Sequence, residues 1–92
     1  MNNKNEDILQ YLNKTNKKKF NFLLTEFLAL SIIFTQSLIE NNSQKCLDNM
    51  KKIKNIVLNC EEIMNNLYDK SNIFILLNLK RILFKMMMKI RK

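Results

Sequence analysis

Glycine and proline are both absent from this chain of 92 residues. Glycine usually supplies the positive φ angles of tight hairpins, and the chain is also poor in Val and Thr, which favour strands. Without proline, nothing interrupts a long helix, so breaks must come from polar clusters. The sequence therefore predicts an all-α fold.

Three polar clusters divide the chain: NKTNKKK at 13–19, ENNS at 40–43 and DKSN at 69–72. Each carries residues that cap helices or accept a left-handed turn. They predict a short helix at about 4–13 and three longer ones at about 17–41, 43–68 and 72–91. The short linkers favour up-and-down neighbours, so we expect one domain, 1–92: an antiparallel three-helix bundle, made of a helical hairpin plus a C-terminal amphipathic helix, with a short N-terminal helix.

The predicted helix at 43–68 has the clearest pattern. Its apolar residues step alternately by four and three: Cys46, Met50, Ile53, Val57, Cys60, Met64 and Leu67. This heptad seam indicates a helix packed on partners. The two cysteines lie two heptads apart, roughly 21 Å along one axis, too far for a disulfide with each other. We expect them to be small apolar core residues in a reducing compartment.

Residues 17–40, KKKFNFLLTEFLALSIIFTQSLIE, begin with three lysines and continue as a mostly apolar run, as many membrane spans do. However, Asn21, Glu26 and Gln36 interrupt the run. Its longest charge-free part, 27–39, has 13 residues, whereas a span needs roughly 20. The pattern favours a buried amphipathic helix, and a membrane span over 20–39 is the alternative.

The chain offers little for catalysis. It has no histidine, and the adjacent pairs Glu6–Asp7 and Glu61–Glu62 point about 100° apart on a helix, so neither forms a carboxylate dyad. The absence of glycine excludes a glycine-rich phosphate loop. We predict that the protein is not an enzyme and has no metal, cofactor or small-molecule substrate.

The C-terminal segment 73–92 is the most unusual part, with six basic residues and no acidic one. The net charge of +8 accompanies a richness in Asn, Lys and Ile that is typical of A+T-biased codons, so part of it reflects composition. Arg81, Lys85, Lys89 and Lys92 follow one stripe, opposite a broad apolar face. This helix fits a bundle helix with a solvated basic face, a membrane-surface helix, a phosphate binder or a grip for another helix.

The helix lengths and periodicity resemble those of the small helical chaperones of flagellar and type III export, in the class that serves hook-associated proteins and flagellin. The resemblance rests on FLLTEFLAL, then CLDNMKKIKNIVLNCEEI, then SNIFILLNLKR, and covers most of residues 20–92. It implies a cytoplasmic protein that shields an amphipathic helix of an export substrate. The gripping surface we predict comprises Leu79, Leu83, Met86, Met87 and Ile90, with Lys85 and Lys89 as rim charges.

Three alternatives stay open at this point. The protein could associate with a membrane through 20–39 or 73–92, or could form a homodimer. Nucleic-acid binding is disfavoured because the aromatic residues interleaved with basic ones in 73–92 are only Phe74 and Phe84.

Overall fold

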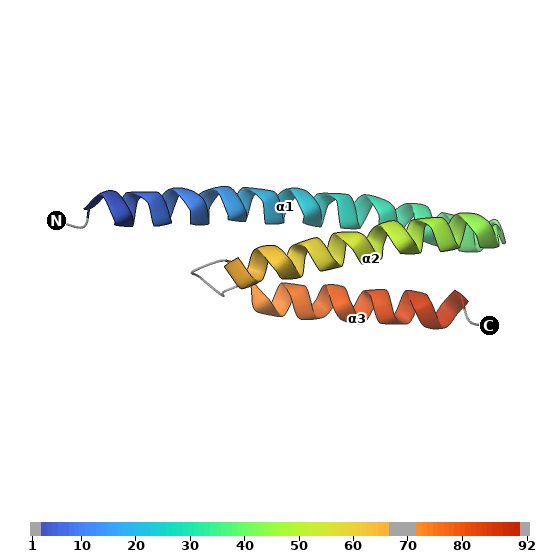
Figure 1. Cartoon of the computed structure of the whole chain (residues 1–92). Helices are drawn as coiled ribbons and strands as arrows, with labels where there is room; N and C mark the ends of the chain where they lie inside the picture. The colour runs from blue at the N-terminus through green and yellow to red at the C-terminus, as the bar shows by residue number, and fades with distance from the viewer. Residues whose placement is uncertain (1–2, 67–71, 91–92) are drawn as a thin grey trace.

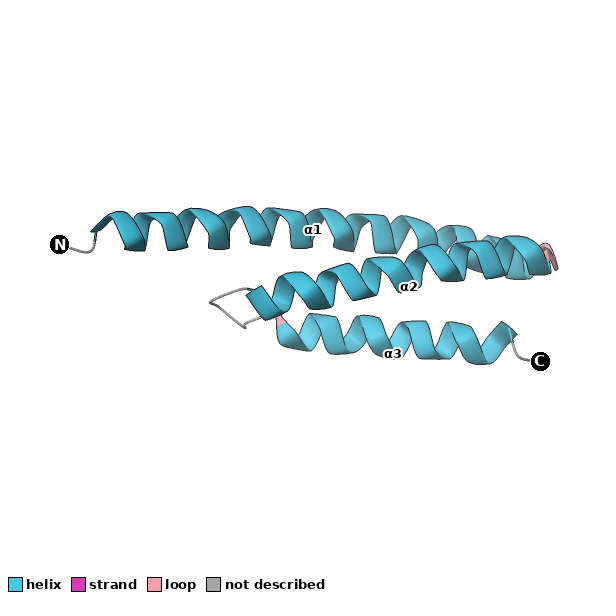
Figure 2. Ribbon diagram, in the orientation of Figure 1, coloured by secondary structure: helices cyan, strands magenta, loops and turns pink. Residues whose placement is uncertain are grey.

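The computed structural model describes residues 3–66 and 72–90, apart from the side chains of 3–5 and 9. These residues form three helices: α1 (Asn3–Ile39), α2 (Ser43–Asn66) and α3 (Ile73–Ile90). No strand occurs in this part of the chain (Figure 2). The all-α fold with adjacent helices in contact is therefore confirmed. The predicted turn at 69–72 lies almost wholly outside the described residues, as do Leu67, Arg91 and Lys92.

The predicted short N-terminal helix is wrong as a separate element, because α1 continues through 13–19 without a break. Lysine is a good helix former, and Asn and Thr cost only a fraction of a kcal/mol each in a helix interior. With neither Gly nor Pro in this stretch, no residue stops the helix. The result is one helix of 37 residues, about 55 Å long.

The turn between α1 and α2 is built by the two asparagines of the predicted ENNS cluster. Asn41 takes the left-handed conformation, with φ of 57°. Its N–H donates to Leu38 O at 3.1 Å, and the N–H of Asn42 donates to Ser37 O at 3.0 Å, which is the Schellman pattern. The Asn42 side chain then caps α2 by accepting from the N–H of Lys45 at 3.1 Å. Asparagine thus reverses the chain in the absence of glycine.

Helix α2 is the central element of the fold. It runs antiparallel to α1 on one side and to α3 on the other (Figure 1). Among the described residues, every Cα atom of α1 lies more than 8 Å from every one of α3. The Cα atoms extend over 61 × 17 × 14 Å, so the molecule is a slender rod. Because α1 has 37 residues and α2 has 24, the N-terminal part of α1 projects roughly 20 Å beyond α2.

The core is a single cluster to which all three helices contribute. Helix α1 contributes Phe20, Phe27 and Phe34, seven residues apart and almost completely buried. The seam predicted on α2 is confirmed: five of its members are buried, Met50 packs against them, and Leu67 is outside the described residues. The remaining buried apolar residues are Ile56 on α2 and Leu76, Leu79 and Met86 on α3.

Two polar side chains are buried in this core, and both are satisfied locally. Ser37 Oγ donates to Ile33 O at 2.8 Å, and Asn49 Nδ2 donates to Lys45 O at 2.9 Å. Each bond returns to the preceding turn of the same helix. These residues therefore occupy core positions without leaving an orphaned donor, which would cost about 1–3 kcal/mol.

Candidate functional site

Helix α3 carries apolar side chains on the side opposite its buried face. These side chains are 52–74% exposed and step by three and four residues along the helix: Phe74, Leu77, Phe84 and Met88. Arg81 occupies the one remaining position of that pattern and is also exposed. We call these five residues the outer row of α3. A surface helix normally carries polar residues on its outward side, so an apolar row there indicates a binding surface.

The apolar residues predicted to grip a partner lie mainly on the other side of α3. Leu79 and Met86 are buried in the core, Leu83 and Ile90 pack against it, and Met87 is half-buried. They form the side of α3 that α2 covers. A partner cannot reach Leu79 or Met86 in this structure, so their role in binding stays a prediction that would require α3 to move.

The two lysines predicted as rim charges, Lys85 and Lys89, are exposed. They lie beside Arg81, which is itself a member of the outer row of α3, and residues 73–90 contain no carboxylate. Lys80 lies on the same helix and forms an ion pair with Glu61 of α2 at 3.1 Å. Both side chains are more than 40% exposed, so this pair contributes little to stability. The outward side of α3 is thus apolar and positively charged.

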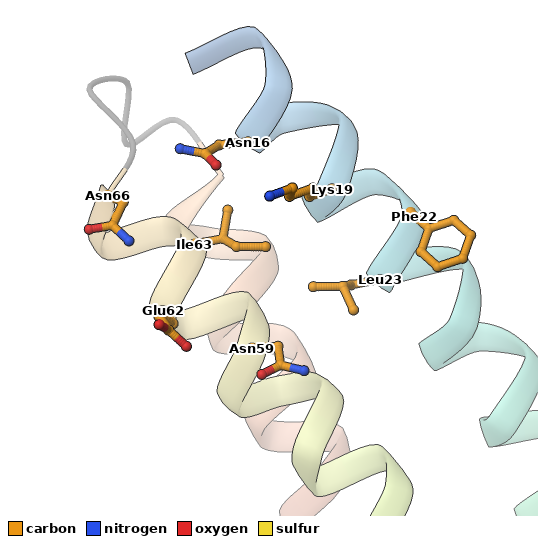
Figure 3. Close-up of a pocket in the computed structure, with 8 residues that line it drawn as sticks. All are labelled: Asn16, Lys19, Phe22, Leu23, Asn59, Glu62, Ile63 and Asn66. Carbon is orange, nitrogen blue, oxygen red and sulfur yellow. The ribbon is translucent and has the colours of Figure 1, made fainter. Parts of the chain in front are cut away.

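An open cleft lies between α1 and α2 near the point where α1 begins to project (Figure 3). Five of its eight lining residues are polar, and the full lining is Asn16, Lys19, Phe22 and Leu23 from α1, and Asn59, Glu62, Ile63 and Asn66 from α2. Leu23 and Ile63 point toward each other across it, and Phe22 turns away (Figure 3). Ligand sites for small molecules usually enclose most of the ligand in an apolar cavity. This cleft is wide and amide-rich, and it does not have that form.

The two cysteines are free thiols within the core, as the sequence predicts. Burial removes the Cys60 thiol from water and raises its pKa from 9.0 to about 11. Since the thiolate is the nucleophile and the metal ligand, a buried thiol of this kind is inert at neutral pH. Among the described residues, no group of three or more His, Cys, Asp or Glu side chains is placed to hold a metal ion.

Helix α1 is long and apolar enough to cross a membrane, judged by length and composition alone. Only 17% of its most apolar 18-residue window is buried inside the protein. A soluble core helix passes the same test of composition, but most of such a helix is buried. The outward side of α1 is therefore a second apolar surface that the three helices leave open.

These features define a class: a small, elongated, three-helix protein whose two outer helices expose large apolar side chains on their outward sides. Comparisons of the chain with protein-family models, curated protein sequences and solved structures gave no match.

Proposed function

We propose that the protein is a small helical binding protein that holds an amphipathic helix of another protein along the outer row of α3. The observation that carries this proposal is the exposure of four large apolar side chains on a side of α3 that also bears Arg81, Lys85 and Lys89. Two helices that pair side by side each present apolar residues with this spacing to the other. The basic border favours a partner helix with acidic residues beside its apolar stripe.

The resemblance to flagellar and type III export chaperones supports a more specific form of this proposal. In that form the partner is an aggregation-prone helix of an export substrate, which the protein shields in the cytoplasm before export. The specific form predicts that the gene neighbours those of a flagellar or type III secretion apparatus. A location away from any such genes would count against the export role and leave helix binding intact.

Helix binding can be measured with a fluorescent 18-residue peptide that has leucine at heptad positions and glutamate elsewhere. Fluorescence anisotropy should show binding to the full-length protein and none to a scrambled peptide of equal composition. Phe84→Asp places a carboxylate in the outer row and should weaken binding at least about tenfold, roughly 1.4 kcal/mol. Leu58→Asp is the matched control, because Leu58 is a comparably exposed apolar residue on α2. Equal binding by both variants would refute the proposed surface.

Association with a membrane surface is the second candidate, favoured by the low burial of the apolar window in α1 and by the basic, apolar outward side of α3. Basic amphipathic helices bind anionic lipid surfaces through the same two properties. Co-sedimentation with vesicles that contain phosphatidylglycerol, but not with pure phosphatidylcholine vesicles, would support it. Alkaline carbonate extraction tests a membrane span through α1, because only a spanning protein stays in the membrane pellet, whereas soluble and surface-bound proteins both leave it.

A further inference from the structure

The outward side of α1 carries a heptad row of its own. Its members are six exposed residues separated by steps of four and three: Asn21, Thr25, Leu28, Ile32, Thr35 and Ile39. We call them the outer row of α1. Leu28, Ile32 and Ile39 are 64–76% exposed, and a shallow groove runs along this side of the helix between residues 28 and 39. Steps of four and three are the pattern of a helix that pairs with another helix in a coiled coil.

The two threonines of this row already have intrahelical hydrogen bonds that would be kept on burial. Thr25 Oγ1 donates to Asn21 O at 3.2 Å, and Thr35 Oγ1 donates to Ser31 O at 2.9 Å. The hydroxyl of Ser31, beside the row, donates to Phe27 O at 2.8 Å. Because each hydroxyl bonds within its own helix, a neighbour that covers the row would leave none of them unpaired. Ala29 is exposed beside the row, and its small side chain would let a second helix pack closely against α1.

When a second copy runs in the opposite direction, the four inner layers of the row pair side chains of like polarity, and only the two end layers pair a polar with an apolar one. In that register Leu28 faces Ile32 of the second copy, Thr25 faces Thr35, and Asn21 faces Ile39. These three pairs occur twice, giving six layers. Each pair joins a residue at one of the two core heptad positions with a residue at the other, as in antiparallel coiled coils. The row spans 18 residue steps, or about 27 Å.

Charge also selects the antiparallel direction. The row continues toward the N-terminus with Lys14 and Lys18, whereas residues 27–39 are uncharged. A parallel pair would place each lysine against its own copy, and like charges at facing positions are destabilising. In the antiparallel register Lys18 lies beyond the last turn of the second copy's α1. The helix dipole is negative there, and Glu40 is exposed nearby.

From these observations we propose that the protein forms a two-fold symmetric homodimer through antiparallel pairing of the outer rows of α1. This interface lies on a different helix from the proposed partner-binding row of α3, and α2 separates the described parts of α1 and α3. The dimer therefore presents two separate α3 surfaces. A single pair of helices of this length falls near the lower limit for stable interfaces, roughly 1,000 Å², so we expect micromolar association.

The mass of the full chain in solution tests the dimer. One chain has a mass of 11.1 kDa, so light scattering and sedimentation equilibrium should give twice that value at concentrations of tens of micromolar. Ile32→Asp puts a carboxylate in two of the six layers and should raise the dimer dissociation constant by about 100-fold. Leu58→Asp should leave it unchanged, and circular dichroism should show that both variants stay folded. A monomeric wild-type protein at several hundred micromolar would overturn the proposal.

Cysteine cross-linking tests the direction of pairing. Thr25→Cys and Thr35→Cys proteins, mixed and oxidised, should form a disulfide with each other, since their Cα atoms would lie within the required 7 Å or so. Neither variant alone should cross-link efficiently, because its two copies lie about 15 Å apart along the axis. The native cysteines are buried and do not compete. Efficient cross-linking of Thr25→Cys alone would overturn the antiparallel register. If the wild-type protein is monomeric and Ile32→Asp abolishes its binding to vesicles, the row binds a lipid surface instead.

Discussion

Two phenylalanines on α1, five residues apart, give the sharpest test of how this helix is oriented. Phe27 is 1% exposed and belongs to the core, whereas Phe22 is 65% exposed. Phe27→Ala removes a fully buried ring, and such truncations cost about 3–5 kcal/mol because they lose apolar burial and leave a cavity. Phe22→Ala removes a ring that stays largely in water, so we expect it to cost less than about 1 kcal/mol.

The assay is urea denaturation followed by circular dichroism at 222 nm, with both variants at the same protein concentration. A domain of this size has a stability of only about 5–10 kcal/mol, so Phe27→Ala should lose roughly half of it. Phe27→Leu is a milder second variant, expected to cost about 1–2 kcal/mol, and gives a measurable transition if the alanine variant does not fold. A loss for Phe22→Ala as large as that for Phe27→Ala would refute the burial of α1 described above.

Three further outcomes are expected. Asn42→Ala should lower the free energy of unfolding by about 1 kcal/mol in the same assay, because it removes the cap of α2, whereas Asn41→Gly should not, since glycine accepts the left-handed conformation at least as well. Between pH 8 and 10 the Cys60 thiol loses its proton in the unfolded chain, whereas in the folded protein, where its pKa is about 11, it keeps it. The free energy of unfolding should therefore fall by about 1.3 kcal/mol over that range. Urea titrations under reducing conditions should show that the Cys60→Ala variant lacks this pH-dependent loss. Hydrogen exchange followed by mass spectrometry should find the amides of residues 6–12 nearly unprotected, since a helical segment that projects beyond the described part of α2 is marginal by itself; protection there equal to that of 27–38 would contradict the described overhang.

Much of the fold can be predicted from the sequence because its signals are local. The absence of Gly and Pro leaves helix as the default state, and the asparagines at 41 and 42 mark the only turn that the structure describes in full. The seam of α2 is readable because polar residues occupy its other sides. The break expected at 13–19 fails for a physical reason: a lysine-rich cluster on a solvated helix meets no penalty large enough to end it.

The binding surface is harder to predict, because α3 is apolar on more than one side. Periodicity finds a row through Leu79, Leu83 and Met86, but it cannot say whether α2 or a partner covers that row. In the structure, α2 covers that row. The outer row of α3 escapes detection because Arg81 interrupts it, and a single charge among four apolar residues makes the stripe look polar. On α1, similarly, Thr25 and Thr35 make the outer row read as polar in the sequence, and only the structure shows that their hydroxyls bond within the helix.

The central position of α2 has a consequence for how fast the chain folds. Within residues 3–66 and 72–90, helix packing joins only sequence neighbours, α1 with α2 and α2 with α3. The α1–α2 hairpin closes over a short turn, so little loop entropy is lost before these two helices pack. Proteins with such local topology fold in microseconds to milliseconds. With no proline in the chain, slow isomerisation is absent as well. During synthesis the α1–α2 hairpin can assemble while α3 is still being made, and α3 then docks on a surface that already exists.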